Sequence, residues 1–177
     1  MVRVRPEVIP FLIVALAAGA VVAALCVGLR MPWPKAAIPG AVLAAVFIGY
    51  FLYFFRDPDR TAPADADAIV AGADGVIMRI AEVREDHYLK TDTIRISIFL
   101  SLFDVHVNRA PIAGRSTFLG YVPGKHYFTF KEKSSEHNQH NAILIEGDKT
   151  RCLVYQIVGP VARRVVYFLD PDRPMPL

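Results

Sequence analysis

Two long apolar runs open the chain, and shorter alternating runs follow them. Val8–Leu29 holds 22 residues without a charge, and Ala36–Phe55 holds 20. At ~1.5 Å per residue, each helix would reach roughly 30 Å, the thickness of a bilayer's hydrocarbon core. The pattern therefore predicts membrane-spanning helices at about residues 8–29 and 36–55. A signal peptide followed by a buried core helix is the alternative, but the first run exceeds the ~7–15 apolar residues of a signal peptide.

Basic residues beside the two runs predict how this hairpin faces the membrane. Four arginines flank its open end, against two basic residues in the turn: Arg3, Arg5, Arg56 and Arg60 against Arg30 and Lys35. Loops rich in Lys and Arg stay on the cytoplasmic side. Both termini and residues 56–177 are therefore predicted on the cytoplasmic face of the cell membrane.

Residues 56–177 have the pattern of one compact, mainly antiparallel β-domain. Thr93–Leu102 alternates, which places Ile94, Ile96 and Ile98 on one face of a strand. Further short β-rich runs are Val76–Val83, Ala142–Glu146 and Arg151–Val158. Asp74-Gly75 and Gly147-Asp148 supply turn residues between the runs, and the second pair is predicted to close a hairpin. Val161–Leu169 fits a strand or a helix. The predicted fold class is mainly β, with an N-terminal two-helix transmembrane hairpin over residues 1–55.

Composition agrees with this division and excludes one class of partner. The chain is 54% hydrophobic and 21% charged, too apolar for an ordinary soluble domain. Residues 1–55 carry four basic residues and one acid, so residues 56–177 carry sixteen of each, and the net +3 belongs to the first third. A β-domain without net positive charge does not suit nucleic acid. Cys26 and Cys152 form no disulfide framework or metal spacing.

A histidine in an apolar setting is the main candidate for chemistry. His106 stands between Val105 and Val107, with Asp104 and Arg109 nearby. Such a histidine is either a structural one or a general acid or base. Asp74, before Gly75, is by itself an ordinary turn residue.

The remaining polar groups have a plain structural interpretation beside a functional one. Arg56 and Arg60 serve as a juxtamembrane anchor, or also hold the domain at lipid headgroups. Arg163 and Arg164 form a solvated edge, or a clamp for phosphate or carboxylate. His137 and His140 lack a third ligand at a convincing spacing, so we expect a polar loop and no metal site.

The order and spacing of several blocks resemble phosphatidylserine decarboxylases of the short, membrane-anchored prokaryotic type, from about residue 50 to residue 165. The blocks are FFRDPxR at 54–60, ADG at 73–75, FxSxFDVHVNRAP at 99–111, PGK at 123–125, ExN at 136–138 and QIxGxxARR at 156–164.

The resemblance implies a carboxy-lyase that removes CO₂ from phosphatidylserine and leaves phosphatidylethanolamine. Its cofactor would be a pyruvoyl group, made when the proenzyme cuts itself at a Gly-Ser bond. Asp74 would orient His106, and His106 would act as base toward that serine and later reprotonate the substrate α-carbon. The substrate would be bound by arginines: Arg56, Arg109, Arg163 and Arg164.

Two departures from the family pattern bear on activity. Ala71-Gly72 stands where the family usually has Ser-Pro or Ala-Pro, and no Gly-Ser pair occurs in the 177 residues. The cleavage serine is therefore expected outside this chain. The chain would be a truncated gene product, a partner of a separate α chain that carries the pyruvoyl group, or a degenerate relative. An incomplete sheet would expose apolar surface and favour association, including a homo-oligomer.

Two rival hypotheses come from other classes of protein. The first is a non-catalytic, membrane-anchored β-domain that binds anionic phospholipid headgroups through arginines: Arg56, Arg60, Arg163 and Arg164. The second is a protein-interaction domain tethered by the hairpin.

Overall fold

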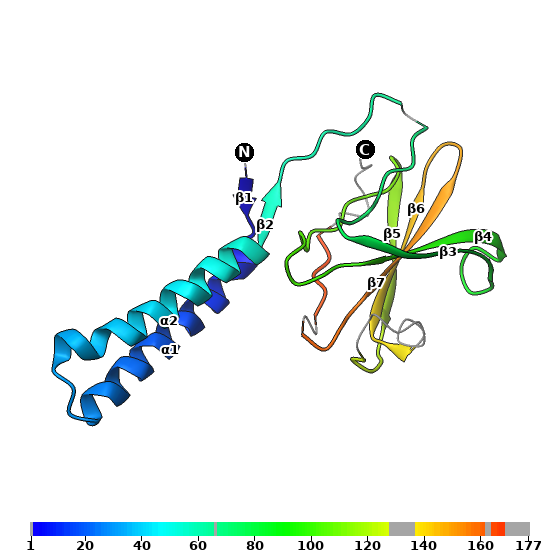
Figure 1. The fold of residues 1–177 in the computed structure, drawn as a ribbon. Helices are drawn as coiled ribbons and strands as arrows, with labels where there is room; N and C mark the ends of the chain where they lie inside the picture. Colours follow the sequence, from blue (N-terminus) through cyan, green and yellow to red (C-terminus); the bar gives the residue numbers. More distant parts are fainter. Residues whose placement is uncertain (1, 66, 128–136, 162–163, 169–177) are drawn as a thin grey trace. The chain divides into compact units, whose positions relative to one another are not determined.

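The computed structural model describes residues 2–65, 67–127, 137–161 and 164–168, and the chain divides into two compact units. The first unit comprises Met1–Arg60 and Leu100–Val107; the second comprises Thr61–Phe99 and Asn108–Leu177. The first holds two helices, and the second holds antiparallel sheets (Figure 1). The mainly β fold behind a helical hairpin is confirmed.

The hairpin consists of α1 (Ile9–Gly28) and α2 (Trp33–Phe54). Both helices are long and apolar enough to cross a membrane, which is consistent with membrane anchoring. The second helix begins at Trp33, three residues before the uncharged run predicted from Ala36. Its first turn contains a proline, Pro34. Proline is accepted there because the first N–H groups of a helix have no partner inside it.

Small residues bring the two helices into close contact. A Cβ added to Gly19 would lie 2.6 Å from the Gly40 carbonyl oxygen, and one added to Gly40 would clash with the Gly19 carbonyl. The other buried helix residues are alanines: Ala15 on α1, and Ala36 and Ala44 on α2. Such small residues let helix backbones approach in lipid, where apolar surface alone does not drive association.

Two short strands close the open end of the hairpin, and the sequence pattern did not predict them. β1 (Val2–Val4) pairs antiparallel with β2 (Arg56–Pro58). Between β1 and α1 lies the 3-10 turn Pro6–Val8. The Arg5 N–H donates to the Phe55 carbonyl at 2.9 Å. The N-terminus is thereby attached to the segment that leaves α2.

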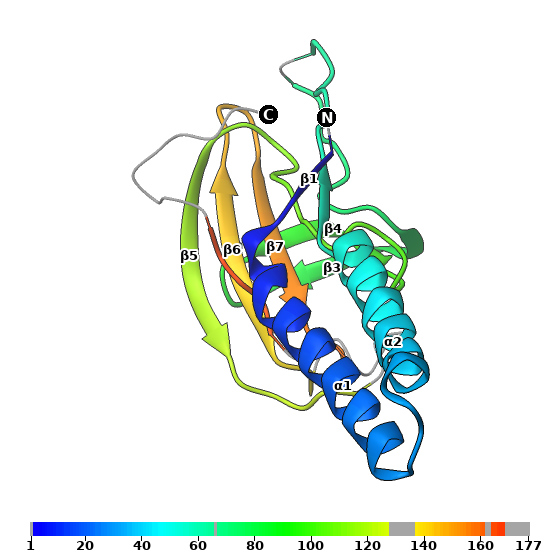
Figure 2. The ribbon, with the colours of Figure 1, turned by 90° about the vertical axis from the view of Figure 1, so that its left-hand side faces the viewer.

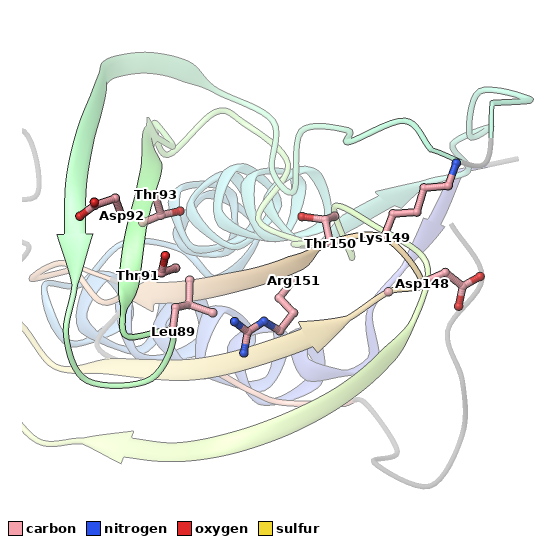
Figure 3. A pocket seen from close by; sticks show the side chains of 9 residues that line it. Leu89, Thr91, Asp92, Thr93, Asp148, Lys149, Thr150 and Arg151 are labelled. Carbon is pink, nitrogen blue, oxygen red and sulfur yellow. The ribbon is translucent and has the colours of Figure 1, made fainter.

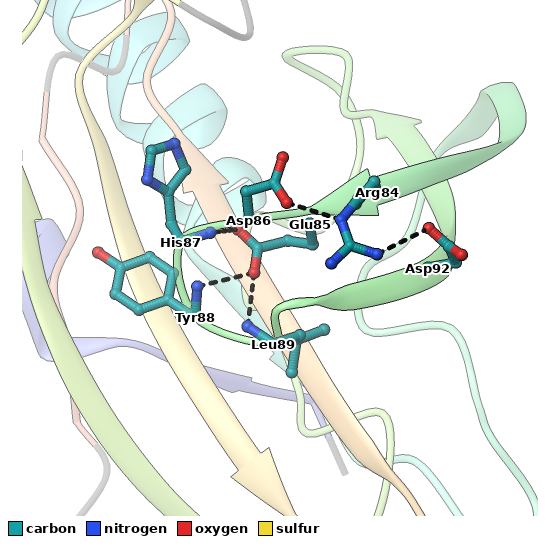
Figure 4. A network of polar contacts seen from close by, with 7 residues as sticks. All are labelled: Arg84, Glu85, Asp86, His87, Tyr88, Leu89 and Asp92. Carbon is teal, nitrogen blue, oxygen red and sulfur yellow. Dashed lines mark hydrogen bonds and ion pairs between the residues drawn. The ribbon is translucent and has the colours of Figure 1, made fainter.

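In the second unit, β3 (Val76–Glu85) and β4 (Thr91–Phe99) form a hairpin with a polar turn. The Glu85 carboxylate accepts the N–H groups of His87 (3.1 Å), Tyr88 (2.8 Å) and Leu89 (2.5 Å), as Figure 4 shows. Burial raises the pKa of Glu85, but these three hydrogen bonds outweigh it and hold the pKa below its usual value.

A three-stranded sheet holds the core of this unit. Its order is β5 (Arg115–Val122), β6 (His140–Glu146) and β7 (Arg151–Ile157), side by side in Figure 2. Ile143 and Ile145 of β6 pack with Ile112, and all three are buried. The Gly147 N–H donates to the Thr150 carbonyl (3.0 Å) in the β6–β7 turn, so the hairpin predicted there is confirmed.

Two details of the β-domain differ from the sequence pattern. β5 was not predicted, because a register shift between Phe118 and Gly120 interrupts its alternation. The shared face of Ile94 and Ile96 is not core: these side chains are 65% and 52% exposed, since β3 and β4 form a sheet of only two strands among the described residues. Within Val161–Leu169, residues 161 and 164–168 are neither helix nor strand.

Gly40→Val should separate α1 from α2, because its side chain would occupy the space of the Gly19 carbonyl. The expected loss of stability is ~1–3 kcal/mol, measured by detergent-induced unfolding of the full chain. Gly49→Val on the same helix is the control, since nothing lies within 4 Å of a Cβ there. Equal losses in both variants would contradict the close contact.

Candidate active site

The segment that follows β4 forms a tight turn built by Ser101 and Asp104. The Asp104 N–H donates to the Ser101 carbonyl at 3.0 Å, and the Ser101 N–H donates to the Asp104 carboxylate at 2.7 Å. Hydrogen bonds from Ser101, first from its N–H and then from its hydroxyl, lower the pKa of Asp104 below its usual value. The charged carboxylate therefore stabilises the turn.

His106 lies just after this turn, and the main chain orients its ring. The Nδ1 atom lies 3.0 Å from the Asp104 carbonyl oxygen. A carbonyl only accepts, so Nδ1 carries the proton, and Nε2 of the neutral ring is an acceptor. The ring stacks on Phe54, the last residue of α2, with 4.2 Å between centroids and 30° between planes. This tautomer suits a general base.

Arg56 connects the end of α2 to the same turn. One guanidinium N–H donates to the Tyr53 carbonyl and another to the Phe103 carbonyl, each at 2.8 Å. The guanidinium also lies over the Tyr53 ring, 3.8 Å from its centroid. Planar arginine suits such a fork better than lysine. Arg56 thus has hydrogen-bond partners both in α2 and in the turn before His106.

Asp74 belongs to the second unit, at the entry to β3, and its predicted pairing with His106 stays a prediction. Gly75 follows it with φ +137°, and a Cβ there would clash with the Phe99 carbonyl. Only glycine allows β3 to start this close to the end of β4. The Asp-Gly pair is therefore required by the backbone, whatever the carboxylate does.

Backbone hydrogen bonds bring the segment before Asp74 beside the segment after His106. The Arg109 N–H donates to the Gly72 carbonyl (2.8 Å), and the Val70 N–H donates to the Pro111 carbonyl (2.9 Å). A Cβ on Gly72 would lie 3.1 Å from the Arg109 carbonyl, so a larger residue would require a small shift there. The ADG block is therefore held beside Arg109, which is itself exposed.

Asn138 joins three of the sequence blocks, and sequence reasoning did not single it out. Its side chain accepts from the Tyr127 N–H (2.9 Å) and donates to the carbonyls of Tyr127 (2.8 Å) and Val158 (3.0 Å). It is 1% exposed. An isolated parallel β-bridge also pairs the main chain of Asn138 with that of Lys125. A buried asparagine with all these hydrogen bonds acts as a structural clamp. The only signal for it in the sequence was its place in the ExN block.

The remaining candidates are more dispersed. Arg164 is exposed, and Arg163 lies outside the described residues. His140 contacts the edge of the Tyr155 ring and bonds to the Asn138 carbonyl at 2.9 Å. Among the described residues, no group of three His, Cys, Asp or Glu side chains could hold a metal ion.

A polar cleft elsewhere in the second unit is not the candidate site. It measures about 440 Å³ and lies between Leu89–Thr93 and the β6–β7 turn, Gly147–Arg151 (Figure 3). Its lining residues include none of the predicted site residues.

Together these features define a β-protein with an apolar helical hairpin and an oriented imidazole at the end of that hairpin. The chain belongs to the phosphatidylserine decarboxylase family, whose model matches residues 47–175. Relatives described as phosphatidylserine decarboxylase proenzymes occur in Carboxydothermus hydrogenoformans (46% identity over 132 residues) and Symbiobacterium thermophilum (39% over 149). These matches cover 75% and 84% of this chain, and 62% and 67% of the relatives. A third, in Desulfotalea psychrophila, is 36% identical over 74% of this chain and 63% of its own.

Asp104→Asn should loosen the turn before His106, because a neutral amide accepts more weakly than a carboxylate. We expect hydrogen exchange of the Ser101 amide to rise several-fold at neutral pH. In the unchanged protein, protection should persist above the ordinary Asp pKa of ~3.9 and be lost as pH falls through the lowered folded-state pKa. Asp86→Asn, at an exposed partner of Arg84, is the control. Unchanged Ser101 exchange in Asp104→Asn would contradict the role of the carboxylate.

Gly75→Ala should destabilise the β3–β4 hairpin, because the methyl group meets the Phe99 carbonyl. Gly120→Ala is the matched control: its φ is also positive (+135°), but nothing lies within 4 Å of a Cβ. The difference in their free energies of unfolding measures the clash apart from backbone strain, and we expect ~1–3 kcal/mol. No difference would mean that β3 and β4 do not approach so closely.

Proposed function

We propose that this chain is the membrane-anchored, base-bearing part of a decarboxylase that converts phosphatidylserine into phosphatidylethanolamine and CO₂. Family membership supports the class of reaction. The single observation that carries the proposal is the His106 ring, held by the Asp104 carbonyl in the tautomer that leaves Nε2 as acceptor, and stacked on the last residue of an apolar helix.

His106 would act as a proton carrier in two steps. As a base, Nε2 takes the proton of the serine hydroxyl during self-processing; as an acid, it returns a proton to the substrate α-carbon after CO₂ leaves. Asp74 would help to orient the ring, and its negative charge would favour the imidazolium that forms when Nε2 takes up the proton. Fixed Nδ1–H geometry means that the ring need not reorganise between these steps.

A pyruvoyl group is the cofactor that this chemistry calls for. When bound, its conjugated carbonyl supplies an electron sink for decarboxylation of an α-amino acid. The residues present fit such a group: an imidazole whose Nδ1 donates to the Asp104 carbonyl keeps Nε2 for proton transfer, which suits both the formation of the group from serine and the later protonation. No Gly-Ser pair occurs in the 177 residues, so the group would be carried by an α chain, with this chain as its partner.

The arginines would handle the charges of the substrate. Arg109 and Arg164 are exposed and suited to the headgroup's phosphate or carboxylate; we propose the same role for Arg163 from its place in the ARR block. Arg56 would add positive charge at headgroup level while it holds Phe103. The acyl chains can then stay in the bilayer while only the headgroup enters the site.

We further propose that α1 and α2 span the cell membrane with both termini and residues 56–177 on the cytoplasmic side. The apolar face containing Ile94 and Ile96 is a surface that the α chain or a second copy would cover, since large exposed apolar faces are uncommon in isolated domains.

His106→Ala should abolish self-processing and lower decarboxylation of phosphatidylserine vesicles by at least ~10²-fold, the range attributed to a positioned acid or base. The assay uses the uncleaved proenzyme that joins this chain to its α chain, and it follows chain separation, CO₂ release and the mass after cyanoborohydride trapping. His87→Ala is the control, because His87 contributes its main-chain N–H to Glu85 and that bond survives the substitution. A processed, fully active His106→Ala enzyme would refute the assignment, and vesicle binding without a trapped adduct would favour a lipid-binding module.

A further inference from the structure

We propose that the loop Leu100–Val107 is seated in the headgroup region of the bilayer, with Leu102 and Phe103 in contact with lipid. The inference rests on the proposed function in one respect, that His106 in this loop acts on a lipid headgroup. The occupant of this apolar surface is the same membrane that α1 and α2 would span.

The loop is attached to the last turn of α2. The Arg56 guanidinium donates to both the Tyr53 carbonyl and the Phe103 carbonyl at 2.8 Å, so a single guanidinium group joins the loop to α2. Two residues beyond Asp104, the His106 ring stacks on Phe54 at 4.2 Å. Tyr53 and Phe54 end the apolar span, where aromatic rings favour the membrane interface. Phe103 must therefore lie at interfacial depth as well.

The tip of the loop presents apolar side chains outward. Phe103 is 67% exposed and Leu102 is 38% exposed, whereas Val105 is 4% exposed. All three belong to the same short segment, so the buried valine fixes the loop while the two larger side chains project from it. Two adjacent apolar side chains next to a membrane helix continue that helix's apolar surface.

The main chain of Phe103 already has its hydrogen bonds, which insertion among lipids requires. The Phe103 N–H donates to the Ser101 hydroxyl (3.3 Å), and the Phe103 carbonyl accepts from Arg56. The Asp104 N–H donates to the Ser101 carbonyl. Phe103 can therefore enter the headgroup region with both its own N–H and its own carbonyl hydrogen-bonded.

This seat would set the depth at which His106 works. An imidazole held at the level of the last α2 residue meets the serine headgroup of a lipid that remains in its leaflet. The loop would then hold the helix ends and the site against the same membrane. The substrate would not have to be extracted from the bilayer.

Depth-dependent quenching tests the seat without any turnover. The full chain carries one tryptophan, Trp33, so Phe103→Trp is made in a Trp33→Phe background. The protein is placed in vesicles of phosphatidylcholine and phosphatidylglycerol, with bromine-labelled phosphatidylcholine as the lipid quencher and iodide as the aqueous one. We expect strong bromolipid quenching at a depth of ~5–10 Å in the headgroup and acyl boundary, with little quenching by iodide. The unchanged protein, with Trp33 alone, calibrates an interfacial ring.

The attachment to α2 is tested by adding Arg56→Lys, which keeps the charge and loses the two-carbonyl fork. We expect the indole introduced by Phe103→Trp to become more accessible to iodide in that variant. Adding Arg3→Gln instead, which removes a charge from exposed β1, should leave quenching unchanged. Iodide quenching of the introduced indole without either added change would overturn the proposal, as would shielding from both quenchers, which indicates a protein partner. Bromolipid quenching of the introduced indole, combined with no decarboxylation by the unchanged protein and its α chain, would instead refute the proposed function alone.

Discussion

The stacking of His106 on Phe54 and the Arg56 bond to Phe103 join a chemically capable loop to the end of an apolar helix. Without these contacts the hairpin would be a tether, and the imidazole would have no defined height above a membrane. Both contacts are short-range, since the two ring centroids lie 4.2 Å apart and a guanidinium fork needs two carbonyls at matching positions. The first unit therefore combines the proposed membrane anchor with His106 of the proposed site.

Close backbone approach is the second constraint, and glycine makes it possible. Gly19 and Gly40 let the helices touch, and Gly75 lets β3 begin beside the Phe99 carbonyl. In lipid, helix contact depends on packing, so two glycines facing each other matter more than they would in a water-driven core. At Gly75 the constraint is conformational, because few other residues adopt φ +137°.

Distant sequence blocks converge through main-chain and clamp bonds. The Gly72 carbonyl accepts from Arg109, and the buried Asn138 amide holds Tyr127 to Val158. Buried, fully bonded polar groups specify one arrangement, because each alternative would leave a donor or acceptor unpaired. The spacing of blocks along the chain thus reflects contacts in space, including several that carry no chemistry themselves.

Local patterns by themselves determined the two apolar helices, most strands, the Gly147-Asp148 turn and the family, because charge-free length, alternation and turn chemistry are properties of neighbouring residues. His106 could also be singled out from the sequence, because it lies in the FxSxFDVHVNRAP block. Only the tertiary structure decided that the Asp104 carbonyl orients its ring, that Arg56 holds Phe103, that Asn138 is a clamp, and that the Ile94 face is exposed. Each of these depends on which surfaces meet after folding, and contacts between residues far apart in sequence leave no periodic signal in the chain.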